Sequence, residues 1–291
     1  MYNNDKLCKV FKHLSKKTWK KIEFNYRNKN YSLREETITN DIIMKLQKLK
    51  ANKILAFDFS PHVEKNKTGA DFEIWFIDKN NNCIGFVIQA KKIRRDFKYR
   101  LYNSRSHKKQ QIHKLFDYAK GYNDLFPLYA FYNYFDEKKR KLNLKCQSFK
   151  EKELNGILIS HASNVYPFVT RPSVNIDEIV SISFPWHCLV CCPGYSMNSN
   201  IASYLNSLIG FADMLSKKII DEKNYGEFFD FNNPPIQKEL PKRIKNIINY
   251  FEDNADLNSE FIRNNWNENI PKHLVIFNNF DDDFKPTKDN E

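Results

Sequence analysis

A predicted β-hairpin constrains this chain more than any other sequence feature. Residues 68–76 and residues 84–92 both alternate with period two and are rich in β-branched and aromatic side chains. Between them, residues 78–82 read Asp-Lys-Asn-Asn-Asn, a run of residues that favour turns. The two segments therefore predict adjacent antiparallel strands joined by a short loop.

The position of the loop decides which side chains share a face of this hairpin. A loop centred on Asn80 or Asn81 places Asp71 opposite Gln89 or Lys91, on the same side of the sheet. A loop centred between two residues would instead turn Asp71 to the other face, because side chains alternate along a strand. The functional hypothesis below depends on the first arrangement.

Polar side chains gather on one face of this apolar hairpin. The alternation places Asp71 and Glu73 on one face of the first strand, and Gln89 and Lys91 on one face of the second. Burying such groups is costly unless they bind something. Oxygen ligands on a rigid sheet suit Mg²⁺, and a nearby lysine can orient the attacking water. The pattern therefore indicates metal-assisted phosphodiester hydrolysis.

Asp71 and Gln89-Ala90-Lys91, preceded by an acidic predicted helix, resemble the PD-(D/E)xK nuclease superfamily in its variant where Gln replaces the second acidic ligand. More closely, the chain resembles a poorly characterised bacterial group of restriction-endonuclease-like proteins over roughly residues 10–195. The segments that carry this resemblance are Arg34-Glu35-Glu36-Thr37-Ile38-Thr39, Thr68-Gly69-Ala70-Asp71-Phe72-Glu73, Gln89-Ala90-Lys91-Lys92, Phe131-Tyr132-Asn133-Tyr134 and Pro185-Trp186-His187-Cys188.

The resemblance implies that Asp71 and Gln89 hold Mg²⁺ or Mn²⁺, that Lys91 is catalytic, and that a glutamate on the preceding helix completes the site. The chain departs from the superfamily at Ala70, where proline is common, and at Gln89, which is neutral and binds Mg²⁺ less strongly than a carboxylate. Glu73, on the same face, could offset that loss.

Two glutamates compete for the helical position. Glu35 falls on or beside the apolar stripe of a predicted helix and faces the sheet, so it is favoured as a metal ligand, whereas Glu36 points nearer solvent and is the alternate. Gln111, on a later helix, could touch the scissile strand. For both Glu73 and Gln111 an ordinary solvent-facing role is the competing interpretation.

The order of predicted elements agrees with the resemblance. A helix over 33–49, a strand over 54–59 and the hairpin are followed by a helix over 104–120 and a strand over 127–134. The expected fold is α/β, a restriction-endonuclease-like αβββαβ core with a mixed central sheet flanked by helices.

The second half is less informative, and mainly helical C-terminal additions are expected. The predicted domains are a nuclease core of residues 1–195 and an extension of residues 196–291 that packs on the core, mediates oligomerisation or docks a partner. The elements expected here are strands at 156–161, 180–192 and 274–277, helices at 201–215 and 241–251, a loop at 232–235, and an acidic tail from about 281.

Charge points toward nucleic acid, since the 291-residue chain has a net charge of +12. Residues 91–120 hold eleven Lys and Arg against two Asp, and residues 1–22 hold seven Lys against one Asp. Clusters of this kind attract a phosphate backbone, although they can also be simple solvated surface. Tyr99 and Tyr102 are expected in a loop over the substrate. The candidate nucleic-acid contacts are Lys92, Arg94, Arg95, Lys98, Arg100, Arg105, Lys108 and Lys109.

Composition and cysteine spacing restrict the remaining classes. No stretch approaches the apolar length of a membrane span, no secretory signal is evident at Met1, and six irregularly spaced cysteines fit a reducing cytoplasm. His187-Cys188-x-x-Cys191-Cys192 suggests zinc, but a structural site normally needs a second pair of ligands, so buried thiols in a core strand are expected instead.

The favoured function is a cytoplasmic, Mg²⁺-dependent endonuclease acting on DNA, and by the resemblance an effector in bacterial antiphage defence. The alternatives are a nuclease acting on RNA and a non-catalytic nucleic-acid-binding module on a degenerate nuclease fold. A homodimer and a defence-system partner or activating signal are further expectations.

Overall fold

The computed structural model describes residues 5–48, 54–58, 68–78, 81–101, 111–121, 125–136, 151–191, 239–253 and 271–278. These residues form a mixed α/β structure around a seven-stranded sheet of order β1-β9-β2-β3-β5-β6-β8. The strands of this sheet are β1 (Ile54–Asp58), β2 (Phe72–Ile77), β3 (Cys83–Lys92), β5 (Leu125–Tyr132), β6 (Ile157–His161), β8 (Phe184–Pro185) and β9 (His273–Phe277).

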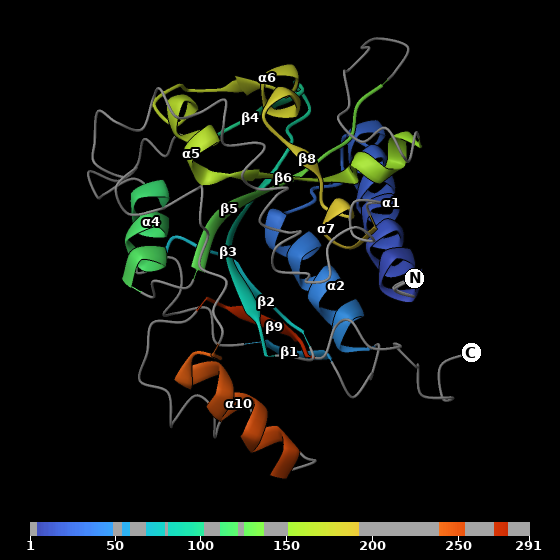
Figure 1. The fold of residues 1–291 in the computed structure, drawn as a ribbon. Helices are drawn as coiled ribbons and strands as arrows, with labels where there is room; N and C mark the ends of the chain where they lie inside the picture. Colours follow the sequence, from blue (N-terminus) through green and yellow to red (C-terminus); the bar gives the residue numbers. More distant parts are fainter. Residues whose placement is uncertain are drawn as a thin grey trace.

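The sheet is mixed, with helices on both faces (Figure 1). The pairs β2–β9 and β3–β5 are parallel, and the other neighbouring pairs are antiparallel. Short strands β4 (Lys98–Tyr99) and β7 (Val174–Asn175) pair separately. The helices are α1 (Asp5–Arg27), α2 (Glu35–Gln47), α4 (Gln111–Gly121), α5 (Ala162–Val165), α6 (Ile176–Ser181), α7 (Cys188–Cys191) and α10 (Lys242–Asp253), with 3₁₀ turns η1 (Lys152–Gly156) and η2 (Tyr166–Phe168).

The predicted hairpin is confirmed, and its loop centres on Asn80, one of the two positions that the sequence left open. In the β2–β3 pair Phe72 lies opposite Ile88 and Trp75 opposite Gly85, so the paired residue numbers add to 160, as a loop centred on Asn80 requires. The same register, continued by one pair, sets Asp71 opposite Gln89. The main-chain N–H of Asp71 donates to Ile88 O at 2.8 Å and extends the ladder to this point.

Helices α1 and α2 cover one face of the sheet, and α4 lies on the other (Figure 1). The first helix was not predicted from the sequence, although its apolar residues recur at helical spacing. Buried along it are Leu7, Phe11, Leu14, Thr18 and Ile22. In the sequence, lysines separate these residues, so the helical spacing is difficult to recognise. On the helix, the lysines lie outside the buried stripe.

Most local predictions hold, with small shifts of boundary. The predicted helix at 33–49 is α2, the strand at 54–59 corresponds to β1, and β5 begins two residues before the predicted strand at 127–134. The strands at 156–161 and 274–277 are β6 and β9, and the helix at 241–251 is α10. The helix at 201–215, the loop at 232–235, the first part of the helix at 104–120 and the tail lie outside the described residues.

The strand predicted at 180–192 is confirmed only at Phe184–Pro185, which extends the sheet beside β6, and is wrong for the rest of the described segment. That segment ends α6, forms the two-residue strand β8, and then enters the short helix α7. The Glu178 carboxylate accepts the main-chain N–H of Asn175, and this contact favours a helix start at Ile176 over an extended chain. Apolar runs of this length do not distinguish a buried helix from a strand.

Cysteine chemistry also differs from the sequence expectation. Cys191 lies in α7 and forms a disulfide with Cys8 of α1, across a sequence separation of 183 residues. Cys188 and Cys83 are buried free thiols, as expected for Cys188, although it lies in a helix and not in a strand. Cys191, bonded to Cys8, is not a free thiol, so the expectation of a buried thiol is wrong for this residue.

The C-terminal part contributes to the main sheet. Strand β9 lies between β1 and β2, so residues 273–277 are integral to the sheet despite following the predicted boundary at residue 195.

Among the described residues, no helix is long and apolar enough to cross a membrane.

A buried ion pair joins α10 to this sheet. The Arg243 guanidinium lies 2.6 Å from Glu73 Oε1 and 5.6 Å from the centre of the Trp75 ring, and the Glu73 side chain is fully buried. Trp75 Nε1 and the Tyr118 hydroxyl also donate to the Glu73 carboxylate. A buried carboxylate of this kind depends on all of its donors.

Arg243→Ala should destabilise the protein by about 3–5 kcal/mol, because it leaves the Glu73 charge buried without its cation. The measurement is the free energy of unfolding from urea titration. The matched control is Arg171→Ala, which removes the partly exposed ion pair with Glu178 and should change stability far less. Equal losses in the two variants would contradict the importance of the buried pair.

Gly69 allows the chain before β2 to lie against α4. Its φ is +69°, and a Cβ built there would lie 2.4 Å from Gln111 O and 2.8 Å from Leu115 N. Both contacts are with helix backbone and cannot be relieved by a side-chain rotation. The glycine therefore fixes how Asp71, two residues later, is placed relative to Gln111.

Gly69→Ala should lower the melting temperature by several degrees, since it combines backbone strain with a steric overlap. Gly121→Ala is the control, because a Cβ there meets no atom within 4 Å. Thermal unfolding followed by circular dichroism compares the two. Melting temperatures that agree within error would show that α4 moves aside at little cost.

Candidate functional site

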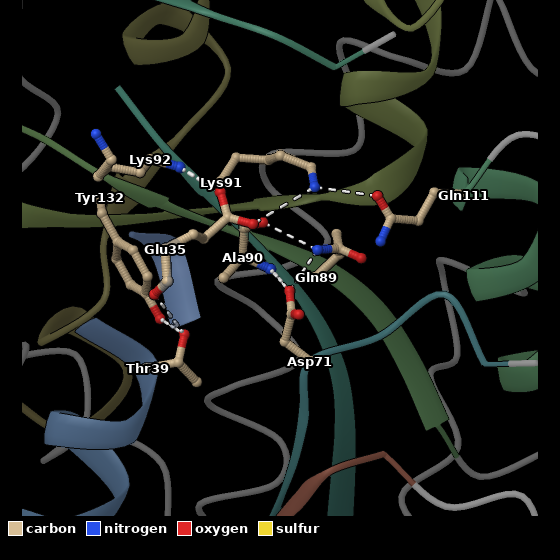
Figure 2. A network of polar contacts seen from close by, with 9 residues as sticks. All are labelled: Glu35, Thr39, Asp71, Gln89, Ala90, Lys91, Lys92, Gln111 and Tyr132. Carbon is tan, nitrogen blue, oxygen red and sulfur yellow. Dashed lines mark hydrogen bonds and ion pairs between the residues drawn. The ribbon is translucent and has the colours of Figure 1, made fainter. Parts of the chain in front are cut away.

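Asp71 and Gln89 meet where β2 begins and β3 nears its end (Figure 2). Asp71 Oδ2 accepts the main-chain N–H of Ala90 at 2.8 Å and also accepts the Gln89 side-chain amide. The same amide nitrogen donates to Ala90 O at 2.9 Å. Two acceptor oxygens therefore face this end of the amide, which must be its nitrogen.

The orientation of this amide leaves the Gln89 oxygen without a partner. Gln89 is 1% exposed, and its Oε1 has no hydrogen-bond partner among the residues that the structure describes. A buried carbonyl oxygen with no donor costs about 1–3 kcal/mol, so natural proteins rarely retain one without a reason. A cation next to this oxygen would satisfy it, because an amide oxygen is an effective ligand for a hard metal ion.

Lys91 brings α2 and α4 together at the same end of the sheet (Figure 2). Its Nζ donates to Gln111 Oε1 at 3.0 Å and lies 3.7 Å from Glu35 Oε1. The second oxygen of Glu35 accepts the main-chain N–H of Lys92 at 2.7 Å. The Lys91 side chain is only 14% exposed, so its ammonium is held between these two oxygen-bearing side chains.

Helix α2 positions Glu35 by its own packing on the sheet. Glu35 is the first residue of the helix, and Thr39, one turn later, bonds through its hydroxyl to the Tyr132 hydroxyl at 2.8 Å. This contact fixes the helix above β5. The Glu36 side chain is exposed, so of the two acidic candidates the structure brings Glu35 to Lys91.

Glu73 has a different environment from the other candidates. It shares a face of β2 with Asp71 by alternation, but its carboxylate is engaged by Arg243, Trp75 and Tyr118. Both of its oxygens have donors, which makes it a structural anion. Gln111, by contrast, belongs to the candidate site, because its side-chain oxygen accepts a hydrogen bond from Lys91.

Tyrosines from β5 lie beside the acidic groups. Tyr129 pairs with Gln89 across the β3–β5 ladder. Burial raises the pKa of Tyr129 and of Tyr132, and the negative charges of Asp71 and Glu35 raise both further. Both phenols therefore stay neutral. Sequence reasoning gave neither tyrosine a role, although Tyr132 stands in one of the segments that carry the resemblance and both belong to the strand predicted at 127–134.

The pKa of Lys92, next to Lys91, is also perturbed. Burial lowers the pKa of Lys92, and the Glu35 carboxylate opposes this effect only in part. Lys92 Nζ donates to Ile93 O at 3.3 Å. Its main-chain N–H, and not its ammonium, contacts Glu35.

The predicted nucleic-acid contacts separate into different roles. Arg95 donates to the main-chain oxygens of Asn25, Asn28 and Tyr31 and so is a structural bridge. Tyr99 is fully buried and donates to the Asn133 side chain, so its predicted place in a loop over substrate is wrong. Arg94 and Arg100 are exposed and Lys98 is partly exposed. Arg105, Lys108, Lys109 and Tyr102 lie outside the described residues.

The donor set matches a hard divalent cation. It offers the carboxylates of Asp71 and Glu35 and the amide oxygen of Gln89, all oxygen ligands of the kind Mg²⁺ and Mn²⁺ prefer. The described residues contain no group of three or more His, Cys, Asp and Glu that could hold a metal. The candidate site therefore depends on the Gln89 oxygen as its third donor.

Comparison with known proteins gives a family but no function. No curated protein matches the chain. Residues 7–283 match the family described as "Family of unknown function (DUF6615)". This match covers nearly the whole sequence, including α1 and β9 as well as the candidate site. The chain belongs to the DUF6615 family.

Proposed function

We propose that the protein is a metal-dependent nuclease of the restriction-endonuclease-like type that hydrolyses phosphodiester bonds in DNA. The observation that carries this proposal is the buried, partnerless Gln89 oxygen beside Asp71. Lys91 and Glu35 lie at the same end of β3, with Lys91 Nζ 3.7 Å from Glu35 Oε1. Acidic and amide oxygens with an adjacent ammonium form a set suited to a phosphodiester and a cation.

Asp71, Gln89 and Glu35 would hold the metal, with Mg²⁺ or Mn²⁺ fitting their oxygen atoms. When bound, such an ion supplies Lewis-acid stabilisation of phosphate charge and lowers the pKa of water. The protein's own contribution is to hold two carboxylates and one amide oxygen on rigid elements. Their positions are set by the β2–β3 ladder and by the start of α2.

Lys91 would act on the water and the phosphate. Its ammonium is held by Gln111 and Glu35, so it is oriented before the substrate arrives. A cation fixed in this way can orient a water molecule and stabilise negative charge that develops on the phosphate in the transition state. Gln111 is then a positioning residue.

The order of elements supports a restriction-endonuclease-like core. Apart from the two-residue strand β4, the elements α2, β1, β2, β3, α4 and β5 follow the αβββαβ order of that fold. The net charge of +12 favours a polyanionic substrate. A role in bacterial antiphage defence completes the proposal, and its support is the sequence resemblance.

The test is cleavage of supercoiled plasmid DNA by the purified full chain in Mg²⁺, in Mn²⁺ and in EDTA. Asp71→Asn and Lys91→Ala should each lower the cleavage rate at least about 100-fold, because each removes a group that touches the ion or the phosphate. Glu35→Gln should have a similar effect. The matched control is Glu36→Gln, the same change one residue along α2, which should retain most activity.

Cleavage that persists in Asp71→Asn, or that proceeds in EDTA, would exclude the mechanism. A labelled RNA strand of the same sequence, tested in parallel, separates the DNA and RNA alternatives. Tight, salt-sensitive DNA binding by an inactive wild type, unchanged by Asp71→Asn, would instead support the non-catalytic module.

A second test follows the metal directly and needs no activity. Gln89→Glu replaces an amide donor with a carboxylate facing Asp71 Oδ2, so in EDTA the like charges should lower the melting temperature. Mg²⁺ or Mn²⁺ at millimolar concentration should restore it, with a larger shift than in the wild type, because the added carboxylate strengthens cation binding.

Gln111→Glu is the matched control for that experiment. It makes the same Gln to Glu change beside the Lys91 ammonium, where a negative charge is favourable, so no destabilisation in EDTA is expected. Differential scanning fluorimetry of both variants gives the comparison. A Gln89→Glu protein whose melting temperature ignores the divalent ion would argue against a metal at this position.

A further inference from the structure

A second cluster of functional groups lies on the exposed side of α1. His13, Lys17, Lys20 and Phe24 recur at steps of four, three and four residues, so they share one face of the helix. All four side chains are exposed. The opposite face holds the buried apolar stripe, so this polar face is the surface that α1 presents outward.

This face borders a pocket. The cavity has a volume of about 410 Å³, within the range of natural small-ligand sites. Its walls come from α1 and from the segment that connects α1 to α2. The lining residues are His13, Lys16, Lys17, Lys20, Lys21, Phe24 and Tyr31.

The pocket carries excess positive charge. Lys16 is paired with Glu151 and Lys21 with Asp41. Lys17 and Lys20 have no carboxylate partner among the residues that the structure describes, and both are exposed. The ligand that such a pocket attracts is an anion.

Electrostatics at His13 agree with that assignment. Burial lowers the pKa of His13, and the charges of Lys45, Lys17 and Lys20 lower it further.

Two exposed aromatic rings stand beside the lysines. Phe24 is 54% exposed and Tyr31 is 43% exposed, and their ring centres are 5.4 Å apart in an edge-to-face contact. An exposed aromatic pair next to lysines is the arrangement that binds single-stranded nucleic acid, where bases stack and phosphates pair with cations. An anion without a ring system would not use these two side chains.

The pocket adjoins the candidate active site along the chain. Tyr31 precedes Glu35 by four residues, a reach of at most about 14 Å for extended chain. Arg95, just beyond β3, donates to Tyr31 O at 2.9 Å and to Asn28 O at 2.8 Å. The wall of the pocket is thus tied to the turn that follows Lys91.

We propose that this α1 pocket binds a single-stranded segment of the nucleic-acid substrate, with phosphates on Lys17 and Lys20 and a base against Phe24 and Tyr31. This single-stranded segment of the nucleic acid lies beside the nucleic-acid strand that enters the candidate site at Lys91. The inference rests on the proposed function for the choice of a nucleic-acid strand over other anions. Binding at the pocket requires no cleavage.

The test is fluorescence anisotropy of a labelled twelve-residue oligothymidylate with the full chain in EDTA, at several salt concentrations. Lys17→Glu/Lys20→Glu should weaken binding at least tenfold and reduce the slope of log K against log salt by about 1.4, the value for two phosphate contacts to a single strand. Phe24→Ala/Tyr31→Ala should weaken binding at least about fivefold with little change of slope.

The matched control is Lys242→Glu/Lys245→Glu, which makes the same change of charge at exposed positions of α10 and should bind nearly as the wild type does. Equal weakening by both lysine pairs would overturn the proposal, because it would show an effect of net charge alone. Unchanged binding in the α1 variants would overturn it as well.

Two other ligands are tested with the same proteins. If thymidine monophosphate competes as well as the oligonucleotide, the pocket is a free-nucleotide site. If vesicles containing anionic lipid bind through Lys17 and Lys20 and the oligonucleotide does not, this face is a membrane-binding surface. Either result overturns the strand proposal. Since EDTA excludes metal-dependent hydrolysis, failure here leaves the nuclease proposal standing, and an inactive nuclease leaves this binding test intact.

Discussion

The candidate site depends on the hydrogen bonds that Asp71 Oδ2 accepts from Ala90 N and from the Gln89 amide. Bonds to a charged acceptor contribute about 1.5–3 kcal/mol each, more than those between neutral groups. They join the chain before β2 to β3 at the point where the ladder ends. They also determine which end of the Gln89 amide faces the carboxylate, and therefore where its unsatisfied oxygen points.

Two carboxylates on one face of β2 serve different purposes. Glu73 lies within the sheet, fully buried, and is neutralised by Arg243 from a helix near the C-terminus. Asp71 directly precedes β2, at the end of a central strand. It accepts hydrogen bonds from a main-chain N–H and a side-chain amide, which are neutral donors. Neutral donors stabilise a carboxylate without cancelling its charge, whereas the Arg243 guanidinium neutralises the charge of Glu73.

Local patterns in the sequence predict the centre of this arrangement. The hairpin and the inward position of Glu35 follow from alternation with period two and from the helical stripe of α2. Alternation narrows the partner of Asp71 to Gln89 or Lys91, and the structure selects Gln89. These features depend on neighbours within a few residues or across one short loop. The same local logic predicted Gln111 on the helix beside the site.

Contacts between distant segments were beyond the same reasoning. Strand β9 enters the sheet between β1 and β2, and Arg243 reaches Glu73 across 170 residues. Cys8 and Cys191 are joined across 183 residues. Nothing in a five-residue apolar run specifies which strands it will join. Arg95 shows the same limit, because a basic residue in a basic cluster gives no sign that it binds three main-chain oxygens.

Arg95 also links the two proposed parts of the substrate path. Its guanidinium binds main-chain oxygens of the segment between α1 and α2, residues 28–34. That segment contains Tyr31 and leads into Glu35. A displacement of this segment would change the aromatic wall of the pocket and the start of α2 together. Strand binding on α1 and the placement of Glu35 beside Lys91 are therefore mechanically connected, and an Arg95 substitution should disturb both, which no purely catalytic substitution would do.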